Sequence, residues 1–231
     1  MKTIGLIGGM SWESTAEYYR IINQHVNQRL GKLHSGKIII YSVNFQEIDE
    51  LQRHGGWEKL ATLMVHSAKC LENAGADLLA ICANTTHKVA EEVEGSVKIP
   101  LVHIADSTAR KILDRGMTKV GLLGTEYTMK QSFYRRRLKQ LFGIDVIIPG
   151  EEDMAFVHRT IFEELIRGQL RDASRERFNE IMGKLCKEGA QGVILGCTEI
   201  PLLVKQEKIK ITLFNTTQIH AVATAELSLL P

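Results

Sequence analysis

The sequence is poor in cysteine, and its cysteines are not spaced for a structural metal site. The 231 residues include only Cys70, Cys82, Cys186 and Cys197, with no C-x-x-C pair and no histidine at zinc-finger spacing from them. This spacing argues against a fold held together by zinc, and in a reducing compartment all four should be free thiols. Cys70 and Cys186 fall within helical periodicity, which leaves Cys82 and Cys197 as candidates for chemistry.

Long apolar runs and an excess of charge of either sign are also missing. No apolar segment reaches the ~18 residues that a membrane span requires, and Met1-Lys-Thr leads into a strand without a cleavable signal. The net charge of +2 gives no reason to expect nucleic acid or an anionic membrane as a partner. We therefore expect a cytoplasmic protein that binds neither nucleic acid nor membrane.

Sequence motifs for the common cofactors are absent. The turn Gly8-Gly9-Met10-Ser11 is not a G-x-G-x-x-G fingerprint, so a dinucleotide is not indicated. No lysine is singled out for pyridoxal phosphate, and no cluster of metal ligands or flavin motif is present. The expected activity uses no cofactor and no metal. The glycines either bring backbone N–H groups close to an anion or simply connect a strand to a helix.

The chain contains a regular alternation of strands and helices. Apolar runs that suit buried strands are residues 2–7, 37–43, 78–82, 99–104, 118–123, 145–148, 192–195 and 209–214. Helical periodicity covers residues 14–30, 57–74, 88–94, 105–115, 129–142, 155–167, 174–188 and 217–230, and residues 44–53 form a loop or short helix. Ser14-x-x-Glu17 predicts a capping box, and Ser174 predicts an N-cap. This alternation predicts parallel α/β sheets.

Three internal echoes divide the chain into two similar halves. Ile4-Gly-Leu-Ile-Gly resembles Val120-Gly-Leu-Leu-Gly, residues 75–85 resemble residues 189–199, and residues 97–102 resemble residues 209–214. The echoes keep one order at offsets of 116, 114 and 112 residues. They predict two α/β domains that face each other. The first comprises residues 1–104, completed by a helix at about 215–231, and the second comprises residues 105–214.

Cys197 is the strongest candidate for chemistry. The apolar strand before it ends at Gly196, and ligands of parallel sheets bind beyond the carboxyl ends of strands. A free cysteine is most often a small core residue, but the polar Thr198-Glu199 marks the end of this strand and favours a functional thiol. The 114-residue echo pairs Cys197 with Ala83. Cys82 is displaced by one residue, which in a strand points its side chain to the other face.

These motifs resemble the aspartate/glutamate racemase family of cofactor-independent amino-acid racemases. The resemblance rests on Ile4-Gly-Leu-Ile-Gly-Gly-Met-Ser-Trp-Glu-Ser-Thr, Cys82-Ala-Asn-Thr-Thr-His, Leu122-Leu-Gly-Thr and Gly196-Cys-Thr-Glu-Ile. It implies two Rossmann-like domains related by pseudo-twofold symmetry, an active site between them, and a homodimer. In this family, two cysteines at the strand tips act as base and acid on opposite faces of the α-carbon.

This chain departs from the family pattern, because Ala83 stands where the first cysteine belongs. Some relatives with threonine there are similar to the racemases in function. One-base chemistry is expected, with Cys197 on one face and Thr85, Thr86, a water or Cys82 on the other. The resemblance implies a substrate-binding set of Met10, Ser11, Gln52, Ala83, Asn84, Thr85, Thr86, Thr125, Thr198 and Glu199. Arg53 is either a cation for a substrate carboxylate or an exposed arginine, and His87 is expected to brace the helix after the turn.

Three functions are consistent with these residues. The first is racemisation of an amino acid, aspartate or glutamate, with Cys197 as base. The second is a one-cysteine decarboxylase of the same superfamily, which protonates one face of a malonate-type substrate. The third is an amino-acid-binding protein that has lost turnover through Ala83. The retained Cys197, Thr198 and Glu199 favour the racemase.

Overall fold

The structure, a computed structural model, describes residues 1–231 except the side chain of Lys208. The chain divides into two compact units. Unit 1 comprises Met1–Ile104 and Thr217–Pro231, and unit 2 comprises Ala105–Thr216. The predicted division into two domains stays a prediction, because compactness does not show that a unit folds on its own.

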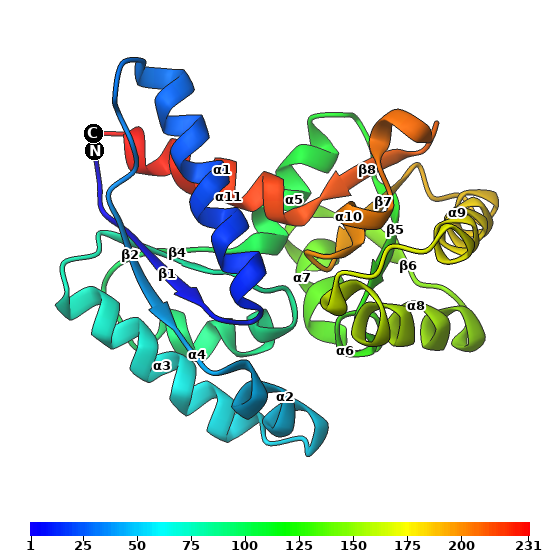
Figure 1. Ribbon diagram of the computed structural model, residues 1–231, viewed down its shortest axis with the longest axis horizontal. Coiled ribbons are helices and arrows are strands. Elements are labelled where there is room, and N and C mark those ends of the chain that lie inside the picture. Colours follow the sequence, from blue (N-terminus) through cyan, green and yellow to red (C-terminus); the bar gives the residue numbers. More distant parts are fainter. The chain divides into compact units, whose positions relative to one another are not determined.

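Unit 1 is built on a four-stranded parallel sheet in the order β2-β1-β3-β4 (Figure 1). Its strands are β1 (Ile4–Gly8), β2 (Ile38–Ser42), β3 (Leu78–Ile81) and β4 (Leu101–Val102). Ile7 of the central strand β1 pairs with Tyr41 on one side and Ile81 on the other. The parallel pairing of β1 and β3 places their carboxyl ends next to each other.

Helices cover both faces of this sheet because its apolar side chains alternate between two cores. Leu6 packs with α1 (Trp12–Leu30) and α11 (Thr216–Leu229), whereas Ile7 packs with α2 (Phe45–Arg53), α3 (Trp57–Asn73) and α4 (Ala90–Glu94). The short 3-10 helix η1 (Thr85–Val89) follows β3 and leads into α4. A parallel sheet buried on both faces explains why its strands read as continuous apolar runs.

Unit 2 repeats this plan with a parallel sheet in the order β6-β5-β7-β8. Its strands are β5 (Lys119–Gly124), β6 (Asp145–Ile147), β7 (Gly192–Gly196) and β8 (Thr212–Asn215). The remaining elements are α5 (Ile104–Leu113), α6 (Glu126–Lys130), α7 (Ser132–Phe142), α8 (Glu151–Glu163), η2 (Leu165–Arg167), α9 (Asp172–Lys187), α10 (Ile200–Leu203) and η3 (Gln206–Lys208). Two parallel sheets with flanking helices confirm the predicted α/β class.

The repeat extends to the glycines of the two central strands. A Cβ placed on Gly5 would lie 2.8 Å from Leu79 Cδ2, and one placed on Gly121 would lie 2.8 Å from Leu185 Cδ1. Each glycine therefore lets apolar side chains approach the strand backbone closely. This requirement explains the glycine in the two sequence echoes that begin at Ile4 and Val120.

Both predicted N-caps are wrong. Helix α1 begins at Trp12, and its N-cap is Ser11, whose Oγ accepts from the backbone N–H of Ser14 at 3.3 Å. Helix α9 begins at Asp172 after Arg171, and Ser174 Oγ instead donates to Glu164 Oε2 at 2.6 Å. The hydroxyl of Ser14 likewise bonds elsewhere in its unit, to the Cys82 carbonyl oxygen, rather than to the helix end.

Other predicted elements also differ from the structure. The predicted helix 155–167 is α8, which begins at Glu151, followed by η2, and the predicted strand 209–214 begins only at Thr212. The predicted helix 129–142 is two helices, α6 and α7, separated at Gln131, whose backbone is extended. The predicted strand 99–104 is reduced to Leu101–Val102, because α5 already begins at Ile104. Among the described residues, no helix is long and apolar enough to cross a membrane.

Candidate functional site

In unit 1, predicted site residues gather at the carboxyl edge shared by β1 and β3. Met10 and Ser11 follow β1, and the segment from Ala83 to Thr86 follows β3. In a sheet of order 2-1-3-4, the gap between strands 1 and 3 is the point where ligands bind. Ser14 Oγ donates to the Cys82 carbonyl oxygen at 2.9 Å and joins the two segments. This edge is therefore the candidate site of unit 1.

The glycine turn after β1 connects strand to helix. Gly9 has a φ of +92°, and a Cβ there would lie 2.2 Å from the Val43 carbonyl oxygen. Its backbone N–H donates to Thr15 Oγ1 at 2.8 Å, so it is already used within the unit. The structure favours the plain strand-to-helix connection over anion binding by Gly9. The turn leaves Met10 and Ser11 buried at the sheet edge.

The segment after β3 carries most of the predicted binding groups. Asn84, Thr85 and Thr86 are all buried, and Ala83 is partly exposed. The 3-10 helix η1 begins at Thr85, so these residues form a tight turn at the strand tip. The hydroxyl oxygen of Thr86 is buried and has no hydrogen-bond partner among the described residues. A buried hydroxyl without a partner costs about 1–3 kcal/mol, which makes Thr86 a candidate ligand contact.

Gln52 and Arg53 lie at the end of helix α2, and their surroundings differ. Gln52 is buried. The Arg53 side chain is 61% exposed, and its Nε lies 2.7 Å from Asp49 Oδ2 one helical turn earlier. Such exposed i,i+4 pairs contribute little to stability. The structure thus supports the interpretation of Arg53 as a surface arginine and leaves Gln52 as the buried polar group of this helix.

Cys82 lies inside the core of unit 1. Its side chain is fully buried and packs in the cluster that contains Leu6, Tyr18 and Ala80. Burial raises the pKa of its thiol far above the usual value. A thiol in this environment neither ionises easily nor reaches a ligand at the sheet edge. The catalytic assignment of Cys82 stays a prediction, and its burial counts against it.

In unit 2, the equivalent edge lies between β5 and β7. Gly124 and Gly196 pair across the two strands, and Thr125 and Cys197 directly follow them. Thr125 is the N-cap of α6, where its Oγ1 accepts from the Thr128 N–H at 3.4 Å. Cys197 is partly exposed. Thr125 and Cys197 therefore stand at the strand tips of the candidate site of unit 2.

A single carboxylate oxygen organises the group after β7. Cys197 Sγ donates to Glu199 Oε2 at 2.9 Å, and Thr198 Oγ1 donates to the same oxygen at 2.7 Å. Glu199 is itself buried. Burial raises the pKa of the Cys197 thiol well above its usual value, and the Glu199 carboxylate raises it further. In this arrangement Cys197 is a protonated thiol held next to an acceptor.

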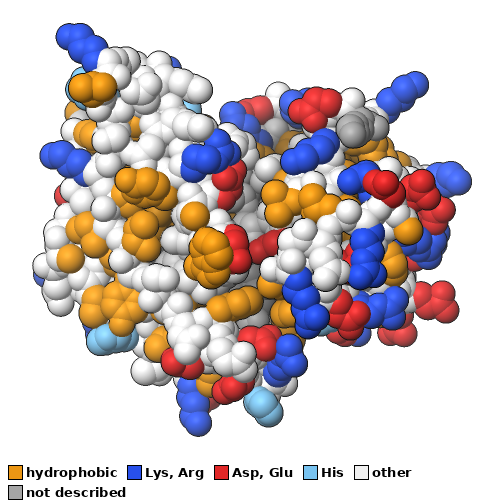
Figure 2. Space-filling model, viewed as in Figure 1, with side chains coloured by type: hydrophobic (Ala, Val, Ile, Leu, Met, Phe, Trp, Pro, Cys, Tyr) orange, Lys and Arg blue, Asp and Glu red, His pale blue; other side chains and the backbone are white. Residues whose placement is uncertain are grey.

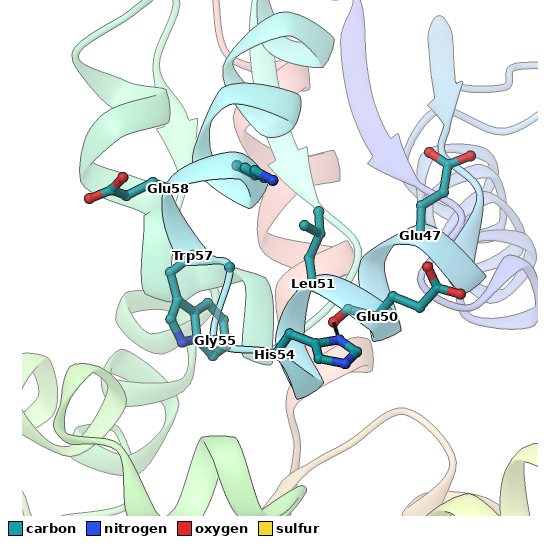
Figure 3. Close-up of a pocket in the computed structure, with 9 residues that line it drawn as sticks. Glu47, Glu50, Leu51, His54, Gly55, Trp57 and Glu58 are labelled. Carbon is teal, nitrogen blue, oxygen red and sulfur yellow. Dashed lines mark hydrogen bonds between the residues drawn. The ribbon is translucent and has the colours of Figure 1, made fainter.

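Unit 1 has a surface pocket away from its β1–β3 strand edge (Figure 3). It lies where α2 ends and α3 begins, and Glu47, Glu50, Leu51, His54 and Trp57 are among the residues that line it. Figure 3 shows the imidazole of His54 bonded back to the Glu50 carbonyl oxygen, a contact of 2.8 Å. None of the predicted site residues lines this pocket. Its carboxylates are exposed to water, as expected for an ordinary surface feature.

The surface in view in Figure 2 carries charges of both signs, as the small net charge of +2 implies. Figure 2 shows acidic and basic side chains close together on the right of the view, and mostly hydrophobic and uncharged side chains on the left. No group of three or more His, Cys, Asp or Glu residues that could hold a metal ion occurs within the described part of the chain.

Sequence reasoning missed two residues that hold the unit 1 edge together. Ser14 bonds to the Cys82 carbonyl, and Thr15 Oγ1 accepts from Gly9 and donates to the Ser11 carbonyl oxygen at 3.0 Å. Their one sequence signal is a cluster of hydroxyl residues at a helix start, which usually indicates a cap.

Comparison with known proteins identifies relatives along the whole chain. The family model described as Asp/Glu/Hydantoin racemase matches residues 7–224. The structure of a proposed Asp/Glu racemase from Yersinia pestis is 51% identical, covers 100% of both chains and gives a TM-score of 0.94. That of an aspartate racemase homologue from Pyrococcus horikoshii OT3 is 41% identical, covers 99% of both chains and gives a TM-score of 0.87.

A curated relative matches over a shorter stretch. The broad specificity amino-acid racemase RacX of Bacillus subtilis (strain 168) is 26% identical over 139 residues, which are 59% of this chain and 60% of the relative. The chain thus spans less than two thirds of the length of that relative.

Proposed function

The chain belongs to the Asp/Glu/Hydantoin racemase family, and on this premise we propose that it is an enzyme that racemises an amino acid, aspartate or glutamate, without a cofactor. The observation that carries the proposal is Cys197, a partly exposed residue directly after β7 whose thiol is hydrogen-bonded to Glu199. The names of the relatives support amino-acid racemisation in general. The family resemblance also supports a homodimer, which light scattering on the purified protein tests.

We assign the base role to Cys197 and its control to Glu199. In the free protein, the carboxylate helps to keep Cys197 protonated. The α-ammonium group of a bound amino acid, paired with Glu199, cancels part of this negative charge and lowers the pKa of the thiol. The thiol proton then passes to solvent, and the thiolate takes the α-proton. The electron pair of the broken C–H bond stays on the substrate, delocalised into its carboxylate.

The proton for the opposite face comes from a group other than a cysteine in this proposal. Ala83 has no proton to give, and Cys82 is enclosed in the core. The Thr85 hydroxyl or a water donates its proton to the carbanion and forms the new C–H bond. Cys197 then loses its proton and the donor regains one through water, which returns both groups to their starting states. Met10, Ser11, Gln52, Asn84, Thr86, Thr125 and Thr198 are proposed to bind the substrate.

The first experiment follows the α-proton of L- and D-aspartate and L- and D-glutamate by proton NMR in heavy water. The wild-type protein is expected to exchange this proton and to form the other enantiomer. Cys197→Ala should reduce both rates to background, because no other group is proposed to take the proton. Cys186→Ala, which alters a partly buried cysteine on α9, is the matched control and should behave as the wild type.

The remaining outcomes separate the alternatives. Exchange that persists in Cys197→Ala would exclude Cys197 as the base. Saturable binding of amino acids without exchange would indicate a binding protein. Loss of carbon dioxide from a malonate-type substrate, without amino-acid exchange, would indicate the decarboxylase. Ala83→Cys adds a thiol at the tip of β3 and is expected to raise the inversion rate about 100-fold or more, the usual contribution of a positioned acid.

A further inference from the structure

Three successive carbonyl groups of the turn after β3 are held by hydrogen bonds. The Cys82 carbonyl accepts from Ser14 Oγ at 2.9 Å, and the Asn84 carbonyl accepts from the backbone N–H of His87 at 3.1 Å. Between them, the Ala83 carbonyl lies 2.7 Å from His87 Nδ1. The peptide plane between Ala83 and Asn84 is thus held by a side chain that titrates, whereas its neighbours are held by a hydroxyl and a backbone amide.

The contacts of His87 determine which ring nitrogen carries the proton. A carbonyl oxygen only accepts hydrogen bonds, so Nδ1 must carry a hydrogen to bond Ala83. The backbone N–H of Ile104 points at Nε2 from 3.3 Å, and an N–H only donates, so Nε2 must present its lone pair. Both contacts are made together by one form of the ring, the neutral imidazole with its hydrogen on Nδ1. A doubly protonated ring would turn an N–H toward the N–H of Ile104.

A second histidine, His220, carries a hydrogen on its other ring nitrogen, Nε2. His220 Nε2 lies 2.6 Å from the Val102 carbonyl oxygen, which only accepts, and Nδ1 lies 2.7 Å from the Tyr18 hydroxyl, which can donate or accept. The ring centroids of His87 and His220 are 5.7 Å apart, and those of His87 and His103 are 4.6 Å apart. All three histidines are buried. His87 is therefore fixed in position by packing as well as by its hydrogen bonds.

We propose that His87 is a positioning residue whose neutral Nδ1–H tautomer sets the direction of the Asn84 amide in the candidate site of unit 1. In a planar trans peptide, the C=O of one residue and the N–H of the next point in opposite directions. Holding the Ala83 carbonyl toward His87 therefore turns the Asn84 N–H away from it. Oriented amide donors of this kind stabilise a carboxylate most when it gains negative charge, as the substrate carboxylate does when the α-proton leaves. The effect on catalysis rests on the proposed function, but the tautomer does not.

The first test reads the tautomer directly. Two-bond proton–nitrogen NMR correlation spectra of the ¹⁵N-labelled protein at neutral pH, assigned with His87 and His220 variants, distinguish the three forms of each ring. The expected result is a neutral ring with Nδ1–H for His87 and a ring with Nε2–H for His220. An imidazolium or an Nε2–H ring at His87 would overturn the proposal, whatever reaction the protein catalyses.

The second test uses two substitutions that each keep one half of the imidazole. The amide nitrogen of asparagine falls near the position of Nδ1, so His87→Asn keeps a donor for the Ala83 carbonyl. The amide of glutamine falls near Nε2, so His87→Gln loses that donor. His87→Gln should lower kcat about tenfold or more and change KM less. This pattern is expected when the Asn84 amide stabilises the transition state more than the bound substrate. His87→Asn should recover most of the lost kcat.

The control variant and the melting temperatures separate positioning from folding. His66→Gln, on the exposed side of α3, should leave kcat unchanged. If His87→Asn and His87→Gln lose stability equally and keep the wild-type kcat per folded molecule, His87 is only structural and the proposal fails. If the wild type shows no exchange with any amino acid while the tautomers are as expected, the proposed function fails and the assignment of the His87 ring stands.

Discussion

Glu199 is proposed to affect the ionisation of the Cys197 thiol in two opposite ways. The carboxylate accepts the thiol hydrogen and raises the pKa of the thiol, which slows formation of the thiolate in the free protein. The same carboxylate is the proposed partner of the substrate ammonium group. When this group binds, its positive charge offsets the carboxylate, and the pKa of the thiol falls. The reactive form of the thiol is then produced mainly when substrate is present, which protects it from unwanted chemistry between turnovers.

Glu199→Gln is expected to change two measurements in opposite directions. The neutral amide no longer raises the pKa of Cys197, so alkylation of the Cys197 peptide by iodoacetamide at neutral pH should speed up, about tenfold for each pKa unit removed. Racemisation should slow roughly 100-fold, because the ammonium partner is lost. Mass spectrometry of the alkylated peptide and the NMR assay measure the two rates.

Glu207→Gln, at an exposed position in η3, is the control and should change neither rate. A slower alkylation of Cys197 in Glu199→Gln would contradict the assigned effect of the carboxylate. In the wild type, kcat/KM should rise with pH from 7 to 9, since the thiol of the free protein is protonated over this range and its ionised form is the base.

The buried thiol of Cys82 should be visible in the pH dependence of stability. Its pKa is raised in the folded protein by burial, so the folded state holds the proton more tightly than the unfolded state. This contribution is fully present below the unfolded pKa of about 8.5 and is lost as the pH rises above it. Cys82→Ala should cost about 1 kcal/mol at pH 7. The difference in the free energy of unfolding between the wild type and Cys82→Ala should narrow by up to about 1.4 kcal/mol per pH unit above pH ~9.

Urea unfolding of both proteins from pH 7 to 10 measures this difference. If the difference in free energy of unfolding between the two proteins stays constant with pH, the core does not hold the thiol of Cys82 protonated. The variant should also keep the racemisation rate of the wild type, and a large loss would reinstate Cys82 as an acid.

At the scale of elements, the sequence predicts most of the strands because each is a short apolar run that ends at a polar or glycine residue. The sequence does not reveal the break between α6 and α7 at Gln131, because no glycine or proline lies there. The caps at Ser14 and Ser174 were misassigned because their hydroxyls bond to Cys82 and Glu164, partners that sequence spacing does not reveal. Local patterns predict elements well, and contacts between elements decide their ends.

The same limit applies to the candidate site. The end of an apolar strand at Gly196 is enough to nominate Cys197, Thr198 and Glu199. Nothing in the sequence shows that the Glu199 side chain returns to accept from both of its neighbours. Nor does it show that the His87 ring reaches back to the Ala83 carbonyl, since that bond depends on the path of η1.

Two glycine substitutions compare a turn that needs glycine with a helix that does not. Gly9→Ala should destabilise the protein by more than about 2 kcal/mol, because its φ of +92° disfavours a side chain and the new Cβ would press on the Val43 carbonyl. Gly183→Ala, within α9 and with no atom near its added Cβ, should stabilise by about 0.5–1 kcal/mol. Thermal unfolding measures both.

The two variants should also differ in activity. Gly9→Ala displaces Met10 and Ser11 and should lower racemisation, whereas Gly183→Ala should leave it unchanged. Equal melting temperatures for Gly9→Ala and the wild type would show that the turn after β1 does not require its left-handed backbone.

At the scale of the whole molecule, two sheets with the same strand order carry different residues at their strand tips. The tip of β7 has Cys197, whereas the corresponding tip of β3 has Ala83, backbone carbonyls held by Ser14 and His87, and a buried cysteine. The echoes at offsets of 112–116 residues predicted the equal topology. They paired Cys197 with Ala83, but they could not show how differently the two turns are supported. The two sheets thus share their strand order but differ in the residues at their strand tips.

Unit 1 is assembled from the two ends of the chain, which lie beside each other in Figure 1. The backbone N–H of Lys2 donates to the Ser228 carbonyl at 2.8 Å, and α11 supplies Ala221, Ala225 and His220 to the same unit. During synthesis on the ribosome, unit 2 is therefore complete before unit 1 can close. Every proposed catalytic side chain has been made by then, yet one face of the first sheet still lacks its last helix. That face of the first sheet is therefore covered only after α11 has emerged from the ribosome.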